Sequence, residues 1–104
     1  MKINDVECFR TMDVATINRL HAKTLTRILL KKGVIKWDND SSVYTLTDEY
    51  KPRTEELTRM AEYTDKSQCK KPYMVWTEAG RQLINSIVES MTQEEIKSYW
   101  FKQY

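Results

Sequence analysis

Apolar residues recur at steps of three and four along residues 13–32, a spacing that places them on one face of an α-helix. The rhythm breaks between Leu20 and Leu25. The pattern therefore predicts two short helices joined by a turn at about residues 21–23, rather than one long helix. Gly33 comes directly after the second helix and suits the left-handed backbone conformation that commonly ends one.

A β-hairpin is predicted next. Residues 34–37 and 43–47 are rich in β-branched and aromatic side chains, which favour strands. Between them, residues 38–42 read Asp-Asn-Asp-Ser-Ser, a run of turn-forming residues. Two such strands with a short polar connection are typical of a hairpin.

The middle of the chain fits two structures. Residues 54–62 follow a proline, begin with acidic residues and have good helix propensity, so we expect a helix there. Alternatively, residues 59–64 form a strand that pairs with residues 73–77, and residues 65–71 connect the two.

Two helices are predicted near the carboxyl end, within about residues 77–103. Thr77 is a suitable N-cap for the first of them. The apolar face of this helix consists of Leu83, Ile84, Ile87, Val88 and Met91. Residues 92–95 read Thr-Gln-Glu-Glu, a capping box that opens the last short helix.

Length and element order together predict the fold class. A chain of 104 residues that is 40% hydrophobic and 31% charged has the size and composition of one globular domain, residues 1–104. Two helices at about residues 13–33, followed by a hairpin at about residues 34–47, are the order of a winged helix-turn-helix. We therefore expect an α+β fold of this kind, with a small three-helix core, one or two β-hairpins and a carboxy-terminal helix.

Composition argues against several classes of function. No apolar run approaches the roughly 20 residues that cross a bilayer, so we expect a cytoplasmic protein without membrane contact. Cys8 and Cys69 are expected to stay reduced, and with His21 they are too few ligands for a zinc site. The two glycines form no phosphate-binding loop. We expect no enzymatic activity, no catalytic residue, no metal and no cofactor.

The net charge of +2 hides an uneven distribution. Residues 14–37 contain no acidic side chain, whereas the rest of the chain carries 11 basic and 15 acidic ones. The basic residues of the acid-free segment are Arg19, Lys23, Arg27, Lys31, Lys32 and Lys36. Such a segment of one sign is typical of a surface that binds an anionic partner.

Several of these cations fall on one face of the second helix. If its apolar residues are buried, the opposite face carries Lys23, Thr24, Arg27 and Lys31, because positions four apart share a face. In a helix-turn-helix this face enters the major groove of DNA, where Arg27 can fork onto a guanine and the lysines can contact phosphates. The predicted DNA-binding residues are Arg19, Lys23, Thr24, Thr26, Arg27, Lys31 and Lys36. Alternatively, the cationic face is only the solvated side of an amphipathic helix.

Asp38 and Asp40 at the tip of the hairpin would repel phosphate, so either the hairpin reaches DNA only through its flanks, chiefly Lys36, or it faces away from DNA. Trp37 and Trp76 are expected to anchor their strands in the core.

Four aromatic residues are gathered in the last six positions, namely Tyr99, Trp100, Phe101 and Tyr104. They either fold back onto the core of their own domain or form an interface, because aromatic residues are enriched at partner surfaces. A homodimer built on them would suit a helix-turn-helix protein that binds two half-sites.

Three segments resemble a known family. Residues 22–35, Ala-Lys-Thr-Leu-Thr-Arg-Ile-Leu-Leu-Lys-Lys-Gly-Val-Ile, are similar to the recognition helix and first strand of carboxy-terminal domains in bacteriophage antirepressors of the KilA-C or Ant type. Residues 44–47, Tyr-Thr-Leu-Thr, and 75–81, Val-Trp-Thr-Glu-Ala-Gly-Arg, resemble later pieces of the same domains. The order of the pieces agrees over about residues 14–90.

This resemblance implies a phage or prophage regulatory protein in the cytoplasm of a bacterial host, with Lys23, Thr24 and Arg27 facing DNA. Two functions are therefore expected. The first is transcription regulation by a protein that binds duplex DNA through its second helix. The alternative is a protein-binding inhibitor, an antirepressor or anti-defence protein, that uses the same fold to block a host or phage regulator, because fold alone does not determine function.

Overall fold

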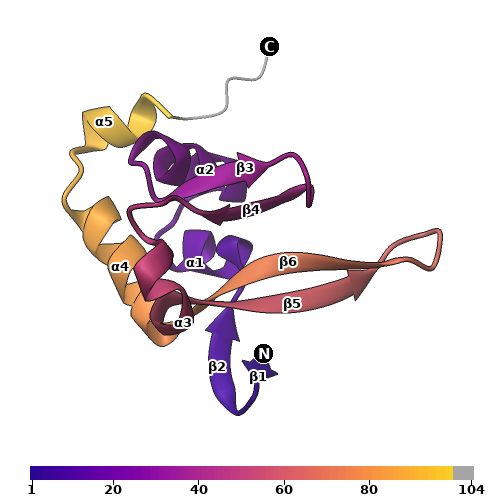
Figure 1. Ribbon diagram of the computed structural model, residues 1–104. Coiled ribbons are helices and arrows are strands. Elements are labelled where there is room, and N and C mark those ends of the chain that lie inside the picture. Colours follow the sequence, from indigo (N-terminus) through magenta and orange to yellow (C-terminus); the bar gives the residue numbers. More distant parts are fainter. Residues whose placement is uncertain (100–104) are drawn as a thin grey trace.

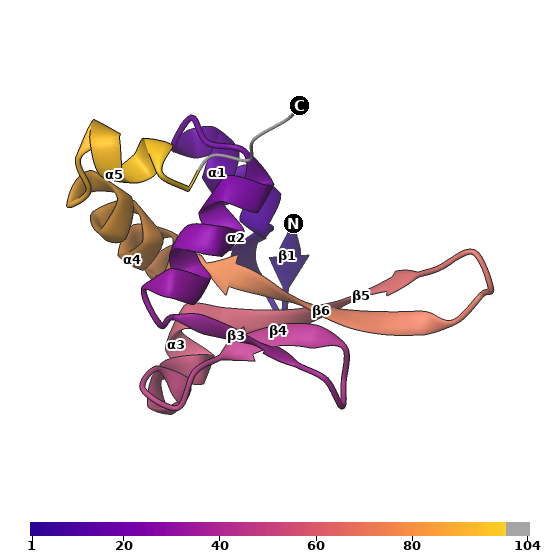
Figure 2. The same cartoon turned by 90° about the horizontal axis from the view of Figure 1, so that it is seen from above.

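The computed structural model describes residues 1–99 and has an α+β architecture (Figure 1). In this part of the chain, five α-helices form a body from which two antiparallel β-hairpins project in the same direction (Figures 1 and 2). The buried core joins side chains from four of the helices and from both sheets. The α+β part of the predicted fold class is therefore confirmed.

Helices α1 (Thr11–Ile17) and α2 (Ala22–Lys31) are the predicted helix pair. The turn between them comprises residues 18–21, slightly earlier than expected, and His21 is the N-cap residue of α2. Both helices bury their apolar faces, because the following side chains are 0% exposed: Val14, Ala15, Leu25, Ile28 and Leu29. Burial of this kind supplies most of the stability of helices as short as these.

Gly33 ends α2, as the sequence predicts. Its φ of 74° is left-handed, and the amide of Val34 donates to the carbonyl oxygen of Leu29 at 2.9 Å. This pattern satisfies carbonyl groups at the helix end that would otherwise lack donors. Strand β3 (Ile35–Asp38) begins two residues after the glycine, so the first hairpin is joined closely to α2.

Strand β3 pairs antiparallel with β4 (Val43–Leu46), and this is the predicted hairpin. Ile35 lies opposite Leu46, and both side chains are buried in the core. After β4, the hydroxyl of Thr47 donates to the carbonyl oxygen of Gly33 at 2.6 Å. The base of the hairpin is therefore fixed against the end of α2.

The middle of the chain is mainly a second hairpin, and the helix expected over residues 54–62 is wrong beyond its first turn. A 3₁₀ turn, η1 (Lys51–Arg53), and a short helix, α3 (Thr54–Leu57), lead into strand β5 (Thr58–Thr64). This strand pairs antiparallel with β6 (Lys70–Thr77), which confirms the alternative structure. Pairing with a partner strand here outweighs local helix propensity.

Two short strands at the amino end, β1 (Lys2–Ile3) and β2 (Val6–Phe9), were not predicted from the sequence. They complete the larger sheet in the order β1-β2-β6-β5. Because β2 pairs with only two residues of β6, the outer edge of β6 over residues 70–75 has no hydrogen-bonded strand among residues 1–99. Pro72 lies on this segment and has no N–H group to offer.

Helices α4 (Glu78–Glu89) and α5 (Gln93–Lys97) correspond to the predicted carboxy-terminal helices. Residues 100–103 of the predicted range lie outside the described residues. Thr77 and Thr92 cap the two helices as predicted, since their hydroxyl oxygens accept hydrogen bonds of 3.2 and 3.1 Å from amides of the first turn.

Residues 76–80 pack in the core and cap the start of α4, which accounts for the residue types at these positions. Trp76 is 0% exposed, as predicted, and its indole N–H donates to the hydroxyl of Thr11 at 3.0 Å. Gly80 is buried where α4 meets α3: a Cβ atom there would overlap the carbonyl oxygen of Leu57 and lie 2.9 Å from the Trp76 ring. A glycine is therefore required at this position of the segment.

Candidate nucleic-acid interface

Helix α2 presents three cations to solvent because its other side is completely buried. Leu25, Ile28 and Leu29 are 0% exposed. The opposite side carries Lys23, Arg27 and Lys31, all exposed, which we call the cationic strip. With 3.6 residues per turn, these three side chains lie within an arc of about 80° around the helix. The structure thus brings these three predicted residues together on one surface.

Arg19 lies in the turn before α2, where it adds a fourth exposed cation near the start of the helix. Its φ of 59° is left-handed. Its amide donates to the carbonyl of Thr16 at 3.0 Å, and the next amide, of Leu20, donates to the carbonyl of Ala15 at 2.8 Å. Arg19 therefore ends α1 in the way that glycine usually does.

The predicted exposure of Thr24 is wrong. Its side chain is 1% exposed, and its hydroxyl finds no hydrogen-bond partner within the described part of the chain. Thr26 is half-buried, and its hydroxyl donates to the carbonyl oxygen of Ala22 at 2.9 Å. Thr24 therefore cannot contact DNA in this conformation, and Thr26 lies at the margin of the exposed face.

Lys36 is exposed on β3, as expected. Its Nζ atom lies 3.8 Å from Oδ1 of Asp48, an oxygen that also lies 3.3 Å from Nζ of Lys51. Exposed ion pairs of this type contribute little to stability and exchange readily with solvent ions. Lys36 can therefore contact a phosphate and would lose only its weak ion pair with Asp48.

The acidic tip of the first hairpin has a structural role. Asp38 accepts hydrogen bonds from the hydroxyl of Ser41 at 2.7 Å and from the amide of Asp40 at 3.1 Å. These bonds, that from Ser41 above all, hold the pKa of the Asp38 carboxyl below its ordinary value. The carboxylate is therefore ionised at neutral pH and closes the turn.

A cleft of about 360 Å³ lies between the two hairpins and reaches α2. Its wall contains four aromatic side chains, which we call the aromatic cleft: Trp37, Tyr44, Tyr63 and Tyr73. Thr26 of α2 and Arg10 of the β2–α1 connection also line it. Figure 1 shows the two hairpins on either side of this space, and the β5–β6 hairpin extends further from the body than its neighbour.

The expected burial of Trp37 is wrong, because its side chain is 49% exposed. Its ring meets that of Tyr44 edge to face, with centroids 5.0 Å apart. On the second hairpin, Tyr63 is likewise 49% exposed and meets Tyr73 with centroids 5.8 Å apart. Each exposed ring is therefore held in place by an aromatic neighbour without being covered.

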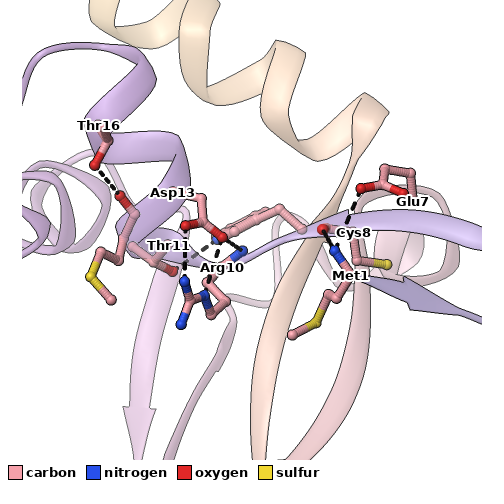
Figure 3. A network of polar contacts seen from close by, with 9 residues as sticks. Met1, Glu7, Cys8, Arg10, Thr11, Asp13 and Thr16 are labelled. Carbon is pink, nitrogen blue, oxygen red and sulfur yellow. Dashed lines mark hydrogen bonds and ion pairs between the residues drawn. The ribbon is translucent and has the colours of Figure 1, made fainter.

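Arg10 is oriented by Asp13 at the start of α1 (Figure 3). Its Nε and Nη2 atoms donate to the two carboxylate oxygens at 3.1 and 3.2 Å, and its backbone amide donates to the same group at 3.2 Å. The guanidinium hydrogen bond holds the pKa of Asp13 below its ordinary value. The pair thus fixes a guanidinium group, neutralised by its carboxylate, in the wall of the aromatic cleft.

A larger hollow of about 710 Å³ lies on the other side of the hairpins, between β4, α3 and β5. Met60, 50% exposed, and Met74 form part of its wall. Its arginine, Arg59, donates to the backbone carbonyls of Glu55 and Thr58. The guanidinium of Arg59 is therefore committed to the protein backbone, and Lys51 and Glu55 are the other charged side chains in the described wall.

The predicted aromatic cluster falls at the limit of the described residues. Tyr99 is half-buried and packs against the hydrophobic core, which agrees with the first of its two expected roles. Trp100, Phe101 and Tyr104 lie outside the described residues. A homodimer built on these residues stays a prediction.

The remaining candidate groups are far apart. Cys8 is buried, Cys69 is exposed in the loop between β5 and β6, and both are free. Among residues 1–99, no three His, Cys, Asp or Glu side chains are close enough to hold a metal ion. His21 is exposed, and its side chain makes no capping hydrogen bond at the start of α2.

The aromatic cleft was missed because its residues are scattered along the chain. Arg10, Thr26, Trp37, Tyr63 and Tyr73 come from five different elements or connections and share no sequence spacing. The one available signal was the alternation along residues 59–64 and 70–77, which places Tyr63 and Tyr73 on one face if these strands pair.

In the part of the chain that the structure describes, no helix has the length and apolar character needed to cross a membrane. Comparison of the whole chain with family models, with characterised proteins and with solved structures gives no match.

Proposed function

We propose that the protein is a winged helix-turn-helix that binds duplex DNA, with α2 as its recognition helix. The observation that carries the proposal is the cationic strip, opposite a completely buried face and within a segment, residues 14–37, that has no acidic residue. Exposed helices ordinarily mix charges of both signs and so gain pairs between positions four apart. Helix α2 contains no acidic residue, so its charged side chains are all of one sign, which suits an anionic ligand.

The dimensions of the element support this role. Helix α2 has 10 residues and is therefore about 15 Å long, and the major groove of DNA is about 12 Å wide. Helix α1 packs against it across a four-residue turn, and the β3–β4 hairpin follows directly as the wing. In proteins of this architecture the second helix enters the major groove while neighbouring elements contact the backbone.

The cations then have different tasks. Arg27, at the centre of the cationic strip, is suited to a forked contact with guanine. Lys23 and Lys31 on either side are suited to phosphates, as are Arg19 before the helix and Lys36 on the wing. Contacts with phosphates position the protein, whereas Arg27 would add sequence preference.

A salt titration with random duplex DNA tests this proposal. With four or five phosphate contacts, affinity should fall about 100- to 1000-fold when salt rises from about 50 to about 200 mM. The Lys23→Glu/Arg27→Glu variant should bind far more weakly than the parent at low salt. Fluorescence anisotropy of a labelled duplex measures both effects.

A charge-matched comparison makes the test specific. Arg27→Glu and Lys2→Glu change the net charge equally, but Lys2 lies on β1, at the other end of the molecule from α2 (Figure 1). Arg27→Glu should weaken duplex binding about tenfold or more, and Lys2→Glu should have little effect. Equal binding by both variants, or no binding by the parent at low salt, would contradict the proposal. Partner binding that survives the reversal of Lys23 and Arg27 would favour the inhibitor alternative.

A further inference from the structure

The aromatic cleft continues the surface that the proposed function uses. Thr26 lines the cleft and lies about 100° around α2 from Arg27, with Lys23 and the exposed Leu30 between them. The exposed surface of α2 therefore extends from the cationic strip to the margin of the cleft, whose wall also contains Trp37 of the β3–β4 hairpin. A ligand bound along α2 would meet the mouth of the cleft.

The rings in the cleft are exposed and fixed in orientation. Trp37 and Tyr63 are each 49% exposed, one on each hairpin. Tyr44 and Tyr73 support them through edge-to-face contacts with interplanar angles of 75° and 63°. Large aromatic side chains that are held in place but not covered are suited to stacking against a planar ligand.

The described wall of the cleft contains no carboxylate that would repel a phosphate. Arg10 is the only charged side chain in its described wall, where no carboxylate is present. The nearest carboxylates are already engaged: Asp13 accepts from Arg10, and Asp38 accepts within its own turn. Across β5 and β6, Lys71 lies directly opposite Tyr63, and its Nζ atom lies 3.5 Å from a carboxylate oxygen of Asp65.

We infer that the aromatic cleft binds an unpaired base of single-stranded nucleic acid that adjoins the duplex on α2. This inference rests on the proposed function. A base would stack on Trp37 or Tyr63, its phosphates would face Arg10, and the hydroxyls of the tyrosines could bond to its edge. The cleft volume of about 360 Å³ lies within the range of small-ligand sites. Aromatic grooves also bind proline-rich peptides, but the continuity with the cationic strip and the absence of a carboxylate from the described wall favour nucleic acid.

The test compares a blunt duplex with the same duplex carrying a single-stranded thymidine overhang of about 12 nucleotides. The parent protein should bind the overhang substrate about 5- to 100-fold more tightly, the gain expected from stacking one base on an aromatic side chain. Trp37→Ala should remove this gain and leave the affinity for the blunt duplex unchanged. Because Trp37 is half-exposed, the variant should keep its fold, which its unfolding midpoint verifies.

Two control variants sharpen the result. Trp37→Phe keeps an aromatic face and should retain most of the gain. Met60→Ala removes an apolar side chain that is 50% exposed but lies outside the cleft, and it should change nothing. Binding of the overhang should also quench tryptophan fluorescence in the parent more than in Trp37→Phe.

The outcomes separate the two proposals. If the blunt duplex is not bound, the proposed function fails together with this inference. If the blunt duplex is bound but the overhang adds nothing, or if Trp37→Ala weakens both substrates equally, only the inference is overturned. Binding of a proline-rich peptide that depends on Trp37, without a gain from the overhang, would also overturn it.

Discussion

At Gly80, a single hydrogen atom in place of a side chain allows α4 to approach α3. The same residue donates its amide to the Thr77 hydroxyl at 3.2 Å, and that hydroxyl in turn donates to the carbonyl of Glu56. Through these two hydrogen bonds, Thr77 at the end of β6 connects α3 with the first turn of α4. The close approach and the cap depend on each other, because a displaced α4 would lose its capping bond.

Gly80→Ala is expected to lower the free energy of unfolding by about 2 kcal/mol or more, although alanine is the better helix former. The added methyl group would overlap a backbone carbonyl, which cannot rotate away as a side chain can. Chemical denaturation measures the loss. Gly33→Ala is the matched control, because no atom lies within 4 Å of its added Cβ and only the left-handed φ of 74° is strained. A smaller loss at Gly80 than at Gly33 would contradict the steric explanation.

Thr24 illustrates how far residue patterns predict the interface. Lys23, Arg27 and Lys31 are exposed as their spacing requires, because positions four apart share a helix face. Thr24 lies at the border of that face, where spacing alone does not determine how far the neighbouring elements cover the helix. A threonine is compatible with either environment, and only the packed structure shows that it is buried.

At the scale of elements, α1 and α2 end in the same way. In each, the residue after the C-cap has a left-handed φ, 59° at Arg19 and 74° at Gly33. In each, the following amide donates back to the last turn, from Leu20 at 2.8 Å and from Val34 at 2.9 Å. The two helices therefore stop sharply, and the elements after them start in defined directions.

Arg19→Gly should raise the free energy of unfolding by about 1 kcal/mol, because glycine adopts the left-handed conformation without the steric cost of a side chain. Arg19→Ala is the control, since it removes the same charge and keeps the strain. Both variants should lose one phosphate contact and shift the salt dependence of duplex binding equally. Equal stability of the two variants in urea would mean that the turn stores no strain.

Elements with a strong local signal could be predicted, and elements that depend on distant partners could not. Residues 34–47 form the expected hairpin because both strands and their turn lie close together in the chain. Local propensity favours a helix over residues 54–62, yet residues 58–64 form a strand, close to the stated alternative, because β6 pairs with all seven of them. Strands β1 and β2 are short, and only β2 pairs with β6, a strand far away in the chain. No local pattern marks such a contact.

Across the whole molecule, several carboxylates are held ionised by hydrogen bonds. The pKa values of Asp38, Asp65 and Glu78 lie below their ordinary values, chiefly because Ser41, Ser67 and Arg81 donate to them. Asp65 closes the loop of the second hairpin, where the amide of Cys69 donates to it at 3.0 Å. These three carboxylates therefore fix two hairpin turns and the start of α4.

Acid should destabilise the protein in a defined range of pH. A carboxyl group whose pKa is lowered by folding stabilises the folded state above its unfolded pKa, about 4, and loses that contribution as pH falls through the folded value. Because these carboxylates stay ionised down to about pH 5, the denaturant midpoint of unfolding should not change with them above that pH. Below about pH 4 the midpoint should decline.

Asp38→Asn isolates one of these groups. The variant should be less stable than the parent at neutral pH, and the difference should shrink as pH falls below about 4, because the parent then loses the same charge. Glu49→Gln, at an exposed residue for which no hydrogen bond or ion pair is found among residues 1–99, is the control and should show a constant offset. A difference between Asp38→Asn and the parent that stays constant down to the lowest pH would show that Asp38 does not titrate with folding.

The open outer edge of β6 affects how copies of the chain behave at high concentration. A long, exposed hairpin edge can pair with the sheet of another copy and so begin aggregation. Here Pro72 withholds a donor in the middle of that edge, and Lys70 and Lys71 place like charges at its outer end. The part of the fold that extends furthest into solvent is therefore poorly suited to recruit further strands, which keeps its aromatic face accessible.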